Sequence, residues 1–325
     1  MNWLPGLESD DEPLPLFASG LAPRLQALAQ RGIYLGTSSW KYEGWLSSIY
    51  SQDQYQTRGK FSQKKFESDC LRDYARVFPA VCGDFSFYQF PSSSFWSHLF
   101  QVVPKQFQFA FKVPEEITVQ SWPRHARYGK RAGGPNENFL NAQTLKRAFL
   151  DPLLPYANQA CVLIFEFGTF SKSAFPHPEA FRDRLAEFLD ELPPGFRYAV
   201  EIRNPEYLGE PYFQTLADRE VAHVFNAWTR MPEMDEQLAM PGAFTAPFTV
   251  ARALLTRGMA YEQAVQGYSP YTRVQNPNPR ARKALAAMIH HALRTASPAF
   301  LFVNNRLEGF SPGTIEGVLG EIQSD

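Results

Sequence analysis

Charged side chains recur at the ends of short apolar runs, where a buried strand would give way to a loop. These side chains are Lys112, Glu166, Glu201, Arg203 and Arg252. Successive strand residues point to opposite faces of a sheet. In a sheet that closes into a barrel, the apolar residues of these runs would face the helices outside, and the charged residues would face the barrel axis. We therefore expect the five charged side chains to converge at one end of the fold.

These residue types could bind an anionic molecule and act on it. Arg203 and Arg252 could each grip a carboxylate or phosphate with two donors. Glu201 is the candidate general base or acid with Glu166 as its partner, and Lys112 is a candidate Schiff-base nucleophile. Two carboxylates that flank a bond also suit glycoside hydrolysis. The pattern predicts a hydrolase or lyase that acts on a small anionic or sugar-like molecule.

Further candidates for ligand contact lie beside the strand ends and offer hydrogen bonds or aromatic faces. They are Ser38, Trp40, Tyr42, Trp45, Tyr88, Asn226, Asn304 and Asn305. Aromatic residues make up 15% of the chain, so core packing is the simpler interpretation of any one of these rings taken alone. The five charges carry both signs and could also neutralise one another without a ligand. We favour a ligand, because buried ion pairs alone add little stability.

Eight short apolar runs bounded by turn residues predict the strands that position these side chains. They are residues 33–37, 80–84, 107–112, 161–167, 197–203, 221–226, 248–252 and 299–304. Segments with helical periodicity lie between them, at residues 64–78, 178–192 and 280–293, and a last one follows at 314–322. This alternation predicts a single-domain (β/α)8 barrel of the TIM type over residues 31–325. An open doubly wound sheet is the alternative.

Residues 1–30 form an acidic, proline-containing tail followed by a helical segment at 15–29, which could cap the bottom of the barrel. Three connections are too long to be simple turns, at residues 39–62, 114–138 and 256–279. Each follows the carboxyl end of a predicted strand, which is the face that carries the active site in such barrels. We expect these long loops to border the site rather than merely to cover the rim.

The overall charge is nearly balanced, with 32 basic and 33 acidic residues among 325. This balance argues against a general electrostatic grip on nucleic acid or on an anionic membrane. A local basic and aromatic loop at residues 122–131 keeps a nucleic-acid-binding or processing protein as an alternative. A solvated basic loop is the simpler interpretation. A ligand-binding protein without catalysis is the remaining alternative.

No cofactor and no metal ligand set is predicted. The three cysteines are far apart and the six histidines lack zinc-binding spacing, although an oxygen-only magnesium site from Asp84, Glu166 and Glu201 remains an alternative. The N-terminus lacks the pattern of a secretory signal peptide, and no apolar run reaches the roughly 18 residues of a membrane span. We expect a cytoplasmic protein.

Five motifs in fixed order resemble those of a bacterial family, the domain of unknown function 72 or YecE-like proteins. They read GTSSWKYEGW at 36–45, FYQFP at 87–91, FAFKVP at 109–114, AVEIRNP at 199–205 and FVNN at 302–305. The resemblance spans about residues 33–318 and implies a barrel of the TIM type. It implies no particular reaction.

The chain departs from the family pattern at three places that bear on the site. A glutamate is missing near Cys82, Glu166 stands where glutamine is usual, and Asn226 stands where aspartate is common. The carboxylates are therefore redistributed around the strand ends. This difference predicts a substrate or an activity unlike that of the typical member.

Overall fold

Eight parallel strands close into a barrel in the computed structural model, which describes residues 13–323. Around the barrel the strands follow the order β1-β10-β9-β8-β7-β6-β5-β4. Their bounds are β1 Ile33–Thr37, β4 Ala80–Gly83, β5 Gln108–Lys112, β6 Ala160–Glu166, β7 Tyr198–Glu201, β8 Ala222–Ala227, β9 Thr249–Ala253 and β10 Ala299–Val303. Each coincides with a predicted run to within a few residues. Closure of the sheet confirms the TIM-type barrel and excludes the open sheet.

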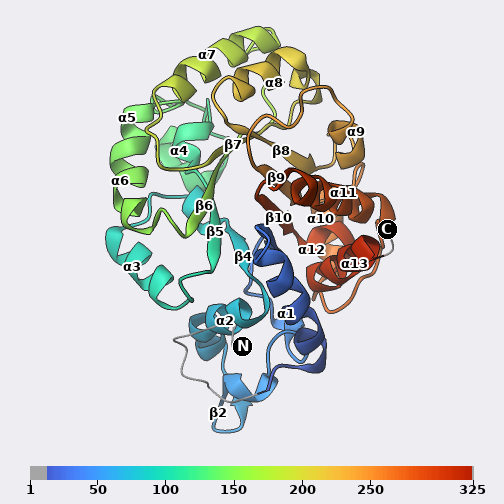
Figure 1. The fold of residues 1–325 in the computed structure, drawn as a ribbon. Coiled ribbons are helices and arrows are strands. Elements are labelled where there is room, and N and C mark those ends of the chain that lie inside the picture. Colours follow the sequence, from blue (N-terminus) through green and yellow to red (C-terminus); the bar gives the residue numbers. More distant parts are fainter. Residues whose placement is uncertain (1–12, 324–325) are drawn as a thin grey trace.

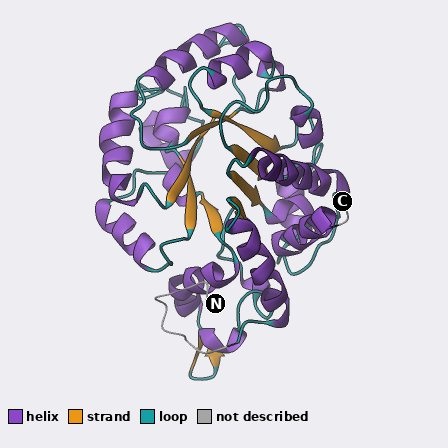
Figure 2. Ribbon diagram, in the orientation of Figure 1, coloured by secondary structure: helices purple, strands orange, loops and turns teal. Residues whose placement is uncertain are grey.

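Helices surround this barrel on the outside (Figures 1 and 2). Their bounds are α1 Leu16–Ala29, α2 Gln63–Val77, α3 Ser93–Gln101, α4 Glu115–Thr118, α5 Ala142–Leu145, α6 Asp151–Leu153, α7 Pro178–Asp190, α8 Glu210–Ala217, α9 Met234–Leu238, α10 Tyr261–Tyr268, α11 Pro279–Thr295, α12 Asn305–Glu308 and α13 Ser311–Gln323. A small hairpin of β2 (Gln56–Thr57) and β3 (Lys60–Phe61) lies in the first long loop. Five of these helices, α1, α2, α7, α11 and α13, lie where the sequence predicts them.

The barrel interior follows from the alternation of side chains along each strand. Ala110, Ile164, Ala199 and Val250 belong to one buried cluster inside the barrel. Two residues further along the same strands come Lys112, Glu166, Glu201 and Arg252. The charged side chains therefore continue the inward-facing rows at the carboxyl ends of the strands, as the alternation predicts.

The seam between β1 and β4 closes the barrel and is its least-paired joint, with Thr37 and Val81 as its one register pair. The hydroxyl of Tyr74 from α2 spans it by accepting from the Thr37 amide at 3.1 Å and donating to the Ala80 carbonyl at 2.9 Å. Gly36 permits this approach, because a Cβ at that position would lie 2.0 Å from the Ala80 oxygen. The glycine of the GTSSW motif therefore has a steric role in closure.

We expect Gly36→Ala to lower the free energy of unfolding by about 1–3 kcal/mol, because the added methyl must force the seam apart. Urea unfolding followed by circular dichroism measures this change. The matched control is Gly20→Ala in α1, where a Cβ would meet nothing within 4 Å. That control should be stabilising, since alanine is the better helix former. Equal effects of the two substitutions would contradict the steric role of Gly36.

The segment before the barrel is described from residue 13 onward. Helix α1 packs against β1 and α2, and Phe17 contacts Phe310 near the C-terminal helix. The predicted acidic tail falls on residues 1–12, outside the described residues. Among the described residues 13–323, none of the helices is both long enough and apolar enough to cross a membrane.

Candidate functional site

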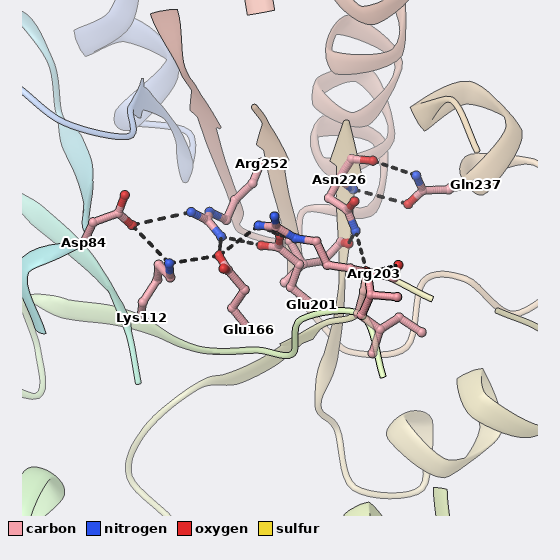
Figure 3. A network of polar contacts seen from close by, with 11 residues as sticks. Asp84, Lys112, Glu166, Glu201, Arg203, Asn226, Gln237 and Arg252 are labelled. Atoms are coloured by element: carbon pink, nitrogen blue, oxygen red, sulfur yellow. Dashed lines mark hydrogen bonds and ion pairs between the residues drawn. The ribbon is translucent and has the colours of Figure 1, made fainter. Parts of the chain in front are cut away.

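Three cationic side chains converge on one oxygen of Glu166 at the mouth of the barrel (Figure 3). Glu166 Oε2 lies 3.1 Å from Lys112 Nζ, 3.0 Å from Arg203 Nη2 and 2.5 Å from Arg252 Nη1. The four side chains come from β5, β6, β9 and the loop after β7. The expected convergence of strand-end charges is therefore present in the structure.

Glu201 is enclosed beneath this point of convergence. Its side chain is 0% exposed; Oε1 accepts from Arg203 Nε at 3.0 Å and Nη2 at 2.7 Å, and Oε2 accepts from Arg252 Nη1 at 2.5 Å. Both oxygens are thus occupied by guanidinium groups. This geometry fits a residue that positions Arg203 and Arg252 better than it fits the general acid or base predicted from the sequence.

Asp84 completes the network on its outer side. Its Oδ1 lies 3.7 Å from Lys112 Nζ and 3.5 Å from Arg252 Nη2, and its side chain is 42% exposed. These contacts are longer than those that the same cations make to Glu166. With Asp84 included, three cations face three carboxylates, so the network is electrically balanced. Asp84 is therefore the residue of the network with the longest ion-pair distances and the most exposed side chain.

The network also fixes protonation states. Burial alone would raise the pKa of Glu166, but the charges of Arg203, Lys112 and Arg252 outweigh it and hold that pKa well below its ordinary value. Glu166 is therefore ionised at physiological pH and does not fit a general acid. Burial would lower the pKa of Arg252, but the charges of Glu201 and its neighbours raise it well above its usual value.

Two aromatic rings cover the cations. Lys112 Nζ lies 3.7 Å from the centre of the Phe87 ring, and the Arg203 guanidinium lies 3.7 Å from that of Trp228. Cation–π contacts of this kind strengthen when water is excluded. The rings therefore shield one side of Lys112 and of Arg203, whereas Asp84 contacts Lys112 and Arg252.

A cavity of about 430 Å³ reaches the network at Asp84. It is lined at the barrel mouth by Ser38, Trp40, Tyr42, Asp84, Asn304 and Arg306. Ser38 Oγ and Trp40 Nε1 are buried there without a hydrogen-bond partner, as is the Nε of Arg252 within the network. A buried polar atom without a partner costs about 1–3 kcal/mol, and a ligand can supply the missing partner. Core atoms such as Trp45 Nε1 and Trp96 Nε1 also lack partners, so it is their place on the cavity wall that makes Ser38 and Trp40 candidate ligand contacts.

Several residues predicted to touch a ligand instead have structural contacts. Trp45 is 0% exposed and stacks on Tyr50 and Tyr74 in the core. Asn305 is 1% exposed and accepts hydrogen bonds from the amide and the hydroxyl of Ser311. The abundance of aromatic residues already made core packing an alternative for Trp45, and that interpretation fits its position better than ligand contact does.

Asn226 and Tyr88 lie at opposite extremes of exposure. Asn226 is 0% exposed, and its amide nitrogen donates to the Ile202 and Val224 carbonyls at 3.3 Å, while its backbone amide donates to Gln237 (Figure 3). Tyr88 is 58% exposed, with the Arg127 guanidinium 4.5 Å from its ring centre. Neither side chain lines the cavity.

The basic loop at residues 122–131 is folded back onto acidic partners. Arg127 pairs with buried Glu115 at 2.9 Å, and Arg131 pairs with Glu116 at 2.9 Å while stacking on Trp122. Two of its arginines are thus neutralised within the protein. This arrangement leaves fewer charges for a phosphate backbone than the sequence alone indicates.

The carboxylates do not gather as metal ligands. Among residues 13–323, no group of three or more His, Cys, Asp or Glu side chains has a metal-binding arrangement. Asp84, Glu166 and Glu201 face Lys112 and the two arginines instead. The oxygen-only magnesium site considered from the sequence therefore does not fit these residues.

Sequence reasoning gave Asp84 only as an alternative magnesium ligand, and it missed one side of the cavity. Asp84 ends the predicted run 80–84, on the inward row of Ala80 and Cys82, so the strand-end rule applied to Lys112 also assigns it to the charged network. The residues of α3 that line the cavity were missed because no helix was predicted there. The spacing of buried Trp96, Leu99 and Phe100 is the helical signal that could have found α3.

The fold and the site together define an eight-stranded parallel α/β barrel of the TIM type with a charged network at the carboxyl rim. Within that class, the chain belongs to the family described as "Protein of unknown function DUF72", which matches residues 34–324. Membership of this family confirms the resemblance noted in the sequence.

Known relatives share the family and the fold. The chain is 25% identical over 178 residues to the UPF0759 protein YecE of Escherichia coli, a match that covers 55% of this chain and 51% of YecE. The chain thus matches about half the length of this curated relative. Solved DUF72 family structures from Thermotoga maritima and Enterococcus faecalis superpose with a TM-score of 0.58 each, at 19% and 16% identity. Each match covers 90% of this chain, and 98% and 95% of the two relatives.

Proposed function

We propose that the chain binds a small anionic or sugar-like molecule at the barrel mouth and acts on it as a hydrolase or lyase. One observation carries this proposal: Asp84, which contacts Lys112 and Arg252, also lines a cavity whose wall holds unpartnered Ser38 Oγ and Trp40 Nε1. An anionic group that displaces the Asp84 carboxylate from Lys112 and Arg252 would meet both cations, and the displaced carboxylate would then be free to act on the ligand. Cations without a stronger partner on that side attract such a group.

Each residue then has a definite role. Lys112 and Arg252 hold the anionic group, and Arg252 still has a free Nε donor. Ser38, Trp40 and Asn304 bind hydroxyls of the ligand from the cavity wall. Asp84 is the general base, because it is the carboxylate that lies against the cavity, and Lys112 stabilises negative charge as it develops. Glu201 and Glu166 act as positioning residues that fix the arginines.

The first test is the binding of inorganic phosphate measured by calorimetry. Lys112→Met should weaken phosphate binding at least about tenfold, because it removes one of the two cations beside the cavity. The matched control is Lys146→Met, since Lys146 is half-exposed, pairs with Asp151 and does not line the cavity. If Lys112→Met, Lys146→Met and the wild-type protein bind phosphate with equal affinity, the proposed anion site is overturned.

A second measurement separates catalysis from binding alone. The unchanged chain is incubated with a panel of sugar phosphates, and products are followed by NMR. We expect cleavage or elimination for at least one compound that binds. Binding with no product across the panel would instead identify a ligand-binding protein without catalysis.

We also place the protein in the cytoplasm. Cys70, Cys82 and Cys161 are all buried and unpaired. Free thiols are typical of a reducing compartment. Fractionation of the source cells tests this location, and recovery outside the cytoplasm would contradict it.

A further inference from the structure

The cavity at the barrel mouth has two chemically different ends. Its inner end is polar and contains Ser38, Asp84 and Asn304. Its outer part extends between α2 and α3, where polar Glu67, Ser68 and His98 border a set of apolar side chains: Leu71, Phe85, Phe95, Leu99 and Val102. A compact polar ligand at the barrel mouth would fill only the first of these ends.

The apolar end depends on a glycine in β4. A Cβ on Gly83 would lie 2.5 Å from the Phe85 ring, so the glycine lets that ring rest against the strand. From there Phe85 contacts Phe95 at 5.2 Å and Trp40 at 5.9 Å between ring centres. These three rings form a continuous aromatic wall from the barrel mouth to α3.

Phe95 stands at the outer edge of this wall with 40% of its surface exposed. Water at an exposed phenylalanine can be displaced with a gain in free energy by an apolar group. Exposed Lys41, Glu67 and His98 border the same opening, so the far end of a bound group would reach solvent.

We propose that the ligand is amphipathic, with an anionic or sugar-like head at the barrel mouth and an apolar arm of aromatic size between α2 and α3. The assignment of the anionic or sugar-like head depends on the function proposed above. The arm rests on the aromatic wall, which begins at Trp40 close to Ser38 on the cavity lining. Ser38 and Trp40 are 1% and 7% exposed, and their Oγ and Nε1 atoms lack partners. Those two atoms would bind the polar junction of head and arm.

Three probes test the two halves separately by calorimetry on the full chain. Methanesulfonate carries the head alone, naphthalene-2-sulfonate carries head and arm, and naphthalen-2-ylmethanol carries the arm without charge. We expect naphthalene-2-sulfonate to bind at least about tenfold more tightly than methanesulfonate, because its rings bury apolar surface.

Variants locate the arm. Phe95→Ala should lower the affinity for naphthalene-2-sulfonate at least about threefold, because it removes part of the apolar wall. The affinity for methanesulfonate should not change. Phe61→Ala is the matched control, since Phe61 is 36% exposed, lies in the β2–β3 hairpin and does not line the cavity. Leu99→Trp, which fills the cavity from α3, should also lower the affinity for naphthalene-2-sulfonate relative to methanesulfonate.

The outcomes distinguish the two proposals. Equal binding of the two sulfonates, or equal effects of Phe95→Ala and Phe61→Ala, would overturn the arm and leave the anion site standing. Tight binding of the neutral alcohol alone would support the arm and overturn the anionic head. Absence of binding by all three probes would overturn both.

Discussion

Glu201→Gln should lower the free energy of unfolding by about 3–5 kcal/mol, because it leaves two buried arginines short of one negative charge. Glu201 is 0% exposed, and Arg203 and Arg252 are 9% and 2% exposed. Water therefore cannot replace the lost carboxylate. Urea unfolding followed by circular dichroism measures the change.

Two further variants test the cause of this loss. Glu187→Gln should change stability by less than about 0.5 kcal/mol, because its side chain is 70% exposed. Adding Arg203→Met to Glu201→Gln should restore part of the lost stability, because it removes one of the uncompensated charges. A loss below about 1 kcal/mol for Glu201→Gln would show that the arginines find other partners.

Asp84→Asn should bind inorganic phosphate about ten- to a hundredfold more tightly than the unchanged chain, by the strength of Coulomb interactions at partly buried sites. The substitution leaves three cations facing two carboxylates, and it removes the charge that covers Lys112 and Arg252. Calorimetry at constant ionic strength measures the affinity. The matched control is Asp183→Asn, which removes a 68% exposed carboxylate paired with Arg182.

The same substitution should abolish turnover of any sugar phosphate that the unchanged chain converts, since an amide cannot act as a general base. Tighter binding together with lost turnover would distinguish Asp84 from a residue that merely holds the ligand. Weaker phosphate binding by Asp84→Asn would contradict the view that its carboxylate covers the cations.

The barrel could be predicted from the sequence because each strand carries its own signal. The alternating run ending in Lys112 fixes both the strand and the face on which the lysine lies, and the same rule applies to Glu166 and Arg252. Closure of eight such strands then brings the side chains together. No contact between distant residues had to be guessed for this part of the site.

The roles within the site could not be predicted in the same way, because they depend on burial and pairing. Nothing in the spacing of Glu201 shows that both its oxygens are held by arginines. Trp45 was predicted to touch a ligand because it belongs to a conspicuous motif, whereas its ring is part of the core. Helix α3 was missed, and with it the apolar end of the cavity.

The seam between β1 and β4 has a bearing on which molecules the barrel can admit. Neighbouring β1 and β10 share five register pairs, whereas β1 and β4 share one. A closed barrel separates most easily between the two neighbouring strands that share the fewest hydrogen bonds. The cavity lies at that side, beside Ser38 and Asp84 at the ends of the two strands. Widening of the entrance there would break one register pair and the two hydrogen bonds of the Tyr74 hydroxyl. Arg252 would stay in place, because its strand β9 shares five register pairs with β10.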